Sequence, residues 1–208
     1  MLYIPYFQVQ EVHVLCERVG DSLFIKSLNL SMAWKIVFYF LGQRMTLKDA
    51  FGYASDNLLD KNVMIIQADC YVDTGFEKLD ENILKKKTMY ALTRHNMPGT
   101  GSDCQMRSVC TEPYLGSHDA YLFRLLVPVS PQFLNQVDYR TNLYGIEQVL
   151  FFNLRKYEKF VIKNPCKILH IVHYHCSGLR VENQLINRSR VDRLLQIRKN
   201  HVAPYSDL

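Results

Sequence analysis

The residues best suited to chemistry lie in one short segment, Gln67–Asp73, with the sequence QADCYVD. It overlaps the end of an apolar run at 63–68 and carries two carboxylates, Asp69 and Asp73. Alternate side chains of an extended chain share a face, so the two carboxylates could point the same way. Carboxylate oxygens suit Mg²⁺ and Mn²⁺. The segment therefore predicts a divalent-cation site, or equally two acids that only cap the turn into the next helix.

A histidine-rich segment near the end of the chain, ILHIVHYH, offers a second set of ligands. His173 and His175 would share one face of a strand, and imidazole is a common metal ligand. Both are candidates to join Asp69 and Asp73 at a metal or phosphate group. The alternative is that they are packed, hydrogen-bonded side chains of the protein interior.

Two further acids stand beside predicted elements. Asp119 follows Ser117 and His118, but three adjacent residues are no catalytic triad, because triad partners meet in space from distant positions. Glu147 opens a predicted helix, where it is either a general base or a favourable anion at a helix N-terminus. The chain has neither of the Gly-rich phosphate-binding loops, which disfavours kinases, P-loop ATPases and dinucleotide oxidoreductases.

The elements that must position these residues alternate between strand and helix. Thr46 with Asp49 forms a capping-box pattern ahead of one helix. Apolar, β-branched and aromatic runs predict strands at 11–17, 35–41, 63–68, 89–93, 120–127, 160–162 and 167–173, and helical spacing predicts helices at 47–59, 77–87, 145–160 and 190–199. Such alternation is typical of right-handed βαβ units in a parallel sheet.

Two runs in this series are expected to be buried strands. The run at 63–68 predicts a central strand buried on both faces, and 35–41 predicts a second buried strand. An acid at the C-terminal end of such a central strand lies where open α/β sheets bind ligands. The segment 95–117 predicts a long loop, and 18–34 looks irregular.

Length and charge fit one domain over residues 1–208, with a core at about 11–180 and a basic helix and tail at 186–208. The net charge of +5 is concentrated near the C-terminus. It indicates either a solvated basic helix or attraction to an anionic partner such as a nucleotide diphosphate. Nucleic acid is not an expected partner, because no nucleic-acid-binding motif accompanies the charge.

The sequence leaves two alternatives open both for the compartment of the protein and for the redox state of its cysteines. The most apolar stretch, 30–41, is shorter than the roughly 20 residues of a membrane span, and no signal peptide is visible. The cytoplasm is therefore one expectation, and the secretory lumen is the other if the N-terminus is truncated. None of the six cysteines forms a Cys-x-x-Cys pair. Cys104 and Cys110 could pair under oxidising conditions or stay reduced.

Taken in order, these segments resemble a series in GT-A-type (nucleotide-diphospho-sugar) glycosyltransferases, over about residues 11–180. The part before residue 11 is shorter than in a full GT-A core. The matching pieces are RMTLKD at 44–49, QADCYVD at 67–73, TR at 93–94, SHDAYLF at 117–123, GIEQ at 145–148, and NP at 164–165 followed by His173, His175, Ser177 and Arg180.

The resemblance implies an α/β fold with a GT-A-like, Rossmann-type, mostly parallel sheet flanked by helices. It implies transfer of a sugar from a nucleotide-diphosphate donor to a hydroxyl of a glycan, protein or small molecule, with Mn²⁺ or Mg²⁺. Asp69 matches the first acid of the metal motif. Tyr71 replaces the second acid, so Asp73 or a histidine would complete the site.

The same resemblance assigns roles to the remaining candidates. Asp119 and Glu147 match acceptor-side acids, one of them the base of an inverting transfer. Arg94 and Arg180 would neutralise phosphate charge, since Arg suits bidentate contact. His173 or His175 would close around the metal and the diphosphate. The alternatives are an inactive sugar- or nucleotide-binding relative, and a metal-dependent phosphoesterase or nucleotidyltransferase that uses the same acids and histidines.

Overall fold

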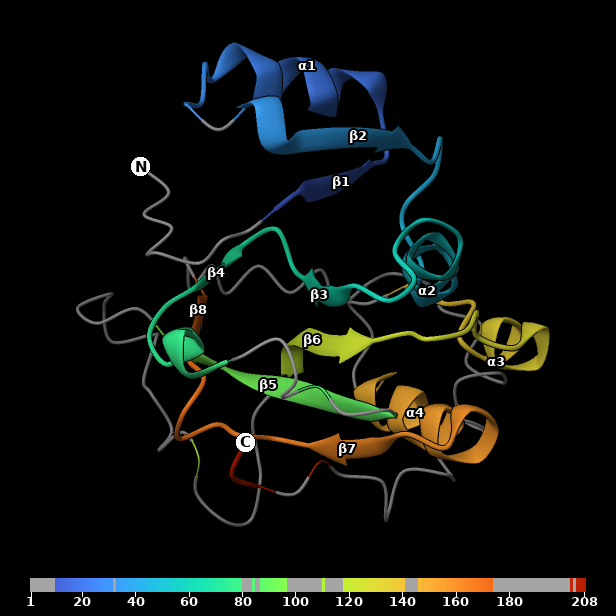
Figure 1. Ribbon diagram of the computed structural model, residues 1–208. Helices are drawn as coiled ribbons and strands as arrows, with labels where there is room; N and C mark the ends of the chain where they lie inside the picture. The colour runs from blue at the N-terminus through green and yellow to red at the C-terminus, as the bar shows by residue number, and fades with distance from the viewer. Residues whose placement is uncertain are drawn as a thin grey trace, which may run out of the picture.

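The computed structural model describes residues 10–31, 33–79, 84, 87–96, 110, 118–140, 146–173, 203 and 205–208 (Figure 1). Its strands are β1 (Val12–Cys16), β2 (Ile36–Phe40), β3 (Asn62–Ile66), β4 (Cys70–Val72), β5 (Thr88–Asn96), β6 (His118–Arg124), β7 (Val161–Lys163) and β8 (Ile171–His173). Its helices are α1 (Val19–Ser27), α2 (Leu47–Asn57), α3 (Pro131–Gln136) and α4 (Ile146–Asn153). A π-helical turn at Leu154–Glu158 extends α4.

The main sheet is built around β5, the longest described strand. β6 pairs antiparallel with β5 on one side. On the other side of β5, first β7 and then β8 pair with it in parallel. β3 adds antiparallel to β6, and β4 adds antiparallel to β8. The order is β3-β6-β5-β8-β4 with β7 beside β5. The predicted GT-A-like, mostly parallel sheet flanked by helices is therefore wrong, because this sheet is mixed and β6 runs against both of its neighbours.

The cause of the error is that β5 and β6 are buried on both faces. Met89 and Ala91 enter a core that α2, α3 and α4 cover on one side of the sheet (Figure 1). Tyr90 and Leu92 enter a second core, which includes Phe76, Leu84 and Leu169. A strand buried on both faces shows a continuous apolar run whichever way its neighbours point, so the pattern cannot reveal direction.

Local predictions fared better than the topology. The helix after Thr46 is confirmed as α2, and its capping box is present, with the Thr46 hydroxyl accepting from the Asp49 backbone N–H. Most predicted strands occur within a few residues of their expected bounds. β3, however, ends the strand order and is only half-buried, so it is not the central strand expected at 63–68.

Several helix predictions need correction. α1 forms inside the segment 18–34 that looked irregular, and α3 was not predicted. At the start of the helix expected at 77–87, the structure has a 3₁₀ turn at Phe76–Lys78, and Leu79 has extended backbone. Residues 80–83, 85 and 86 of that prediction lie outside the described residues. The first two residues of the segment 95–117, which was expected to be a loop, belong to β5, because β5 continues to Asn96. Most of that segment lies outside the described residues. The helix expected at 190–199 lies outside the described residues.

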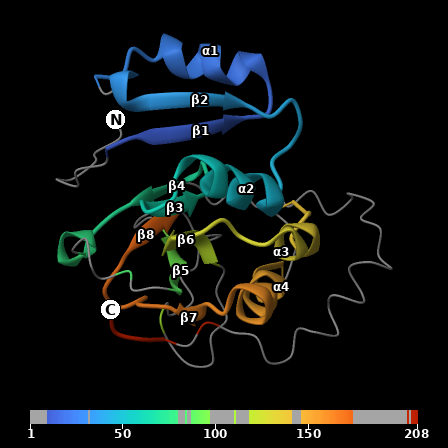
Figure 2. The same ribbon diagram turned by 45° about the vertical axis from the view of Figure 1, so that its right-hand side comes forward.

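The first elements form a βαβ unit: β1 is parallel to β2, and α1, which connects them in the chain, lies beside the strand pair (Figure 2). The sequence predicted a buried strand here, but Tyr39 and Phe40 of β2 are 47% and 56% exposed. α1 contributes no buried residue. Within the described parts of the chain, no helix has the length and apolar character needed to cross a membrane.

Gly75 has a left-handed backbone conformation and lies against the backbone of Ile168. Its φ is +94°, and a Cβ added there would overlap the carbonyl oxygen of Ile168. Gly42 also has a positive φ, +71°, but a Cβ there would meet only the Phe40 ring at 3.6 Å. Alanine substitutions at the two positions therefore distinguish the cost of backbone strain alone, at Gly42, from the cost of strain with steric overlap, at Gly75.

We expect Gly75→Ala to lower the free energy of unfolding by about 3 kcal/mol or more, the sum of left-handed strain and overpacking. Gly42→Ala should cost only the strain, about 1–2 kcal/mol. Urea denaturation of both variants measures the difference. Equal losses would show that the Gly75–Ile168 contact relaxes without cost.

Candidate functional site

Polar side chains from distant parts of the chain meet at one edge of the main sheet. The carboxyl ends of β3, β5 and β8 lie there together with the amino ends of the antiparallel strands β4 and β6. Gln67 follows β3, and Asp69 lies in the turn before β4. Arg94 is near the end of β5, Asp119 is the second residue of β6, and His173 ends β8. We call these five residues the edge cluster.

A β-bulge positions Asp119. Leu92 of β5 is paired with Ala120 of β6, but the next β5 residue, Thr93, is paired with His118. Asp119 is therefore the extra residue of β6 at this point of the ladder. Bulges re-aim side chains and are common beside functional sites.

The Asp119 carboxylate is held from two sides. Gln67 Nε2 donates to Oδ1 at 3.0 Å, and Arg94 Nη1 lies 3.3 Å from Oδ2. The Gln67 backbone N–H also donates to the Asp119 carbonyl at 3.1 Å. The Asp119 side chain is only 3% exposed, so a cation and a donor at this distance offset much of the cost of burying its charge.

The second pair of the edge cluster is Asp69 and His173. His173 Nε2 lies 3.0 Å from Asp69 Oδ2, and the Asp69 side chain keeps 34% of its surface exposed. Cys70 is paired with His173 across β4 and β8. Burial raises the pKa of the Cys70 thiol, and the negative charges of Asp119 and Asp69 raise it further. The thiol is therefore a neutral neighbour of the pair.

The structure does not bring Asp73 into this arrangement. The prediction placed Asp69 and Asp73 on one face of a continuous strand. Asp69 instead lies in a turn, and β4 begins only at the next residue, Cys70. The Asp73 backbone N–H donates to the His170 carbonyl, and the Asp73 charge acts on the pKa of His95. Among the described residues, Asp69, Asp73 and His173 do not form a compact three-ligand group.

Of the other predicted site residues, the structure describes Glu147. Glu147 lies in the first turn of α4, four residues before Phe151 and therefore on the same helix face. The Phe151 ring contacts His118, the neighbour of Asp119, edge to face at 5.0 Å between ring centres. His175 and Arg180 lie outside the described residues.

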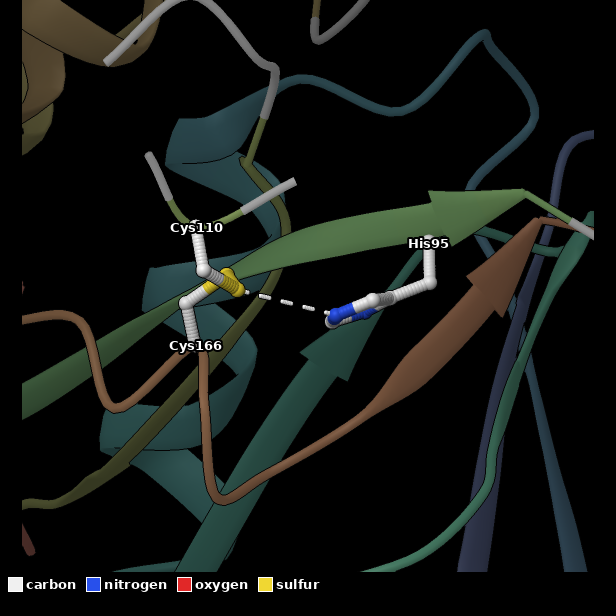
Figure 3. Close-up of side chains that lie close together, drawn as sticks. All are labelled: His95, Cys110 and Cys166. Atoms are coloured by element: carbon white, nitrogen blue, oxygen red, sulfur yellow. Dashed lines mark hydrogen bonds between the residues drawn. A yellow bond between two sulfur atoms is a disulfide. The ribbon is translucent and has the colours of Figure 1, made fainter. Parts of the chain in front are cut away.

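One further cluster was missed by the sequence analysis. Cys110 and Cys166 form a disulfide, and His95 Nε2 lies 3.7 Å from the Cys110 sulfur (Figure 3). The pairing of Cys110 with Cys104 that the sequence allowed is therefore not found. The sequence could not have predicted the Cys110–Cys166 pair, because the spacing of cysteines does not determine which of them form disulfides.

The His95 ring also lies against the His170 ring, with the ring centres 4.4 Å apart and the planes tilted by 33°. Burial lowers the pKa of His95, and the His170 charge lowers it further, whereas the Ile171 carbonyl and Asp73 raise it. His95 and Arg94 are consecutive residues of β5, so their side chains leave opposite faces of the strand. The disulfide cluster and the edge cluster are thus separated by the sheet.

Comparisons with family models, curated proteins and solved structures found no match to this chain. The function must therefore be argued from the arrangement of the residues.

His118, beside the edge cluster, should make stability depend on pH. Burial lowers the pKa of its imidazole from 6.5 to about 3. Between these values the unfolded chain binds a proton that the folded chain does not, so stability falls as the pH is lowered through this window, by at most about 1.4 kcal/mol per pH unit. His118→Gln should flatten this dependence. Denaturation of both proteins between pH 4 and pH 7 measures it, and parallel curves would contradict the assignment.

Removing the cation beside Asp119 should destabilise the fold. We expect Arg94→Leu to lower the free energy of unfolding by about 2–3 kcal/mol, less than for a fully buried pair because the Arg94 side chain is 31% exposed. Combining it with Asp119→Asn should recover part of the loss. Arg124→Leu, which breaks the exposed pair with Asp60, is the control and should cost about 1 kcal/mol or less. Additive losses at Arg94 and Asp119 would show that the two do not interact.

Proposed function

We propose that this protein transfers a sugar from a nucleotide-diphosphate donor to an acceptor hydroxyl, with a divalent cation held by Asp69 and His173. The observation that carries the proposal is the edge cluster. Asp69 and Asp119 are 50 residues apart, and His173 is 54 residues further on, yet all contribute to one edge of the sheet. The segments that supply them are the same ones that resemble the glycosyltransferase series.

The residues present suit a divalent cation. Asp69 Oδ2 and His173 Nε2 lie 3.0 Å apart, and one carboxylate oxygen with one imidazole nitrogen is a donor set that Mn²⁺ accepts. The partial exposure of Asp69 gives a cation and a diphosphate access to the pair. A bound cation would supply charge stabilisation for a departing nucleoside diphosphate.

Arg94 is suited to hold the donor's phosphates. Its guanidinium offers five N–H donors, more than its contact with Asp119 uses. Asp119, which accepts a hydrogen bond from Gln67, holds the guanidinium on one side, so the phosphate oxygens would meet a cation that is already oriented. Asp119 is accordingly a positioning residue in this proposal.

Glu147 is the better of the two candidates for the base that takes the acceptor proton. The Asp119 carboxylate is buried and engaged by Gln67 and Arg94. Glu147 is half-buried at the start of α4, on the helix face that contacts His118. A base must reach solvent-borne substrate, which favours the more accessible acid. The acceptor would be a hydroxyl of a glycan, a protein or a small molecule.

The test is thermal stability with uridine diphosphate and guanosine diphosphate, each with and without Mn²⁺. A ligand at 100 times its Kd adds about 2.7 kcal/mol, so binding gives a clear shift in Tm. We expect a Mn²⁺-dependent shift with one nucleotide that is lost in Asp69→Asn and reduced in His173→Gln. The matched control is Asp60→Asn, at the opposite end of the β3–β6 pair, which should keep the shift.

Product analysis then separates transfer from its alternatives. Release of nucleoside diphosphate from a nucleotide sugar, abolished by Asp69→Asn, would support the proposal. Release of phosphate or pyrophosphate would instead identify a phosphoesterase or nucleotidyltransferase. A nucleotide shift without turnover would identify an inactive binding relative. Absence of any shift would overturn the proposal.

A further inference from the structure

The disulfide cluster on the other face of β5 has the composition of a metal site. Two sulfur atoms and one imidazole nitrogen, from Cys110, Cys166 and His95, all lie within 4.8 Å of one another (Figure 3). Cys166 is buried, and the other two are half-buried. The three residues come from β5, from position 110, and from the turn between β7 and β8, so only the fold brings them together.

The His95 ring is oriented as a ligand. Its Nδ1 lies 3.3 Å from the Ile171 carbonyl oxygen, which can only accept a hydrogen bond. A proton on Nδ1 leaves the lone pair of a neutral ring on Nε2, the nitrogen that faces the Cys110 sulfur at 3.7 Å. A backbone carbonyl that fixes the tautomer in this way is the usual outer partner of a metal-binding histidine.

We propose that His95, Cys110 and Cys166 form a zinc site that exists only when the Cys110–Cys166 disulfide is reduced. A dithiol reductant supplies two electrons and two protons, which break the sulfur–sulfur bond and give two thiols, while the dithiol becomes a disulfide. Zn²⁺ then binds two thiolates and the imidazole, and the two thiol protons are released. Oxidation of the thiolates by a disulfide or another two-electron oxidant re-forms the sulfur–sulfur bond and expels the metal.

The ligand chemistry favours Zn²⁺ over the harder cations. Thiolates are soft ligands that select zinc, whereas Mg²⁺ and Ca²⁺ take oxygen. Two cysteines and one histidine match a three-ligand zinc site whose fourth position is taken by water. The proposal does not depend on the edge cluster, because the side chains of Arg94 and His95 leave β5 on opposite faces.

The experiment compares the full chain in two redox states. One sample is reduced with dithiothreitol and the other is oxidised with diamide, and both are freed of reagent by anaerobic gel filtration. Each is then titrated with Zn²⁺, and with Co²⁺ as a spectroscopic probe of thiolate ligation. We expect the reduced protein to retain one more equivalent of zinc than the oxidised protein and to show thiolate-to-cobalt charge-transfer absorption.

Variants assign the ligands. Cys110→Ala and Cys166→Ala, tested in the reduced state where neither they nor the wild type has the disulfide, should lose the extra equivalent. His95→Gln removes a direct ligand and should weaken zinc binding by more than the roughly 10- to 100-fold that loss of an outer partner causes. Cys16→Ala, which removes a free cysteine in β1, is the matched control and should bind as the wild type does.

Two results would overturn the proposal. One is equal zinc binding by the oxidised and reduced wild type, and the other is equal binding by the reduced wild type and the reduced Cys110→Ala/Cys166→Ala double variant. If the reduced chain loses its near-ultraviolet circular dichroism, zinc should restore the signal in the wild type and not in the double variant. Failure to restore it would also count against the site.

Discussion

The burial of the Asp119 carboxylate is the constraint on which the candidate site depends. A charge with 3% of its side chain exposed requires a nearby cation and hydrogen-bond donors. Arg94 and Gln67 supply them from β5 and from the end of β3, the two strands that pair with β6. The contacts of one carboxylate thus connect three neighbouring strands at the same edge.

The direction of β6 is the second part of that constraint. In a parallel sheet, a residue at the amino end of a strand lies at the opposite edge from residues that follow the carboxyl ends of its neighbours. Because β6 runs antiparallel to β3 and β5, its amino end meets their carboxyl ends. The reversed strand, together with the bulge at Asp119, is what allows Asp119 to share an edge with Asp69.

β5 separates two chemically different environments. Arg94 points toward oxygen-rich groups, which suit phosphates and hard divalent cations. The next residue, His95, points toward sulfur, which suits soft cations or a disulfide. β8 lies beside both residues, in register with Arg94 through Ile171 and with His95 through Val172. The strand pair β5–β8 therefore borders both clusters.

The sequence by itself determined where most strands and the helix α2 lie, to within a few residues. The capping box at Thr46 and the apolar runs of β3, β5 and β6 are local signals, because they depend on side-chain periodicity and on contacts three residues apart. The same signals placed Asp69, Asp119 and His173 at element ends. Strand direction, the bulge at Asp119 and the Cys110–Cys166 bond were decided only by the tertiary structure. All three depend on pairing between segments far apart in the chain, and side-chain periodicity along one strand is the same whichever way its neighbour runs.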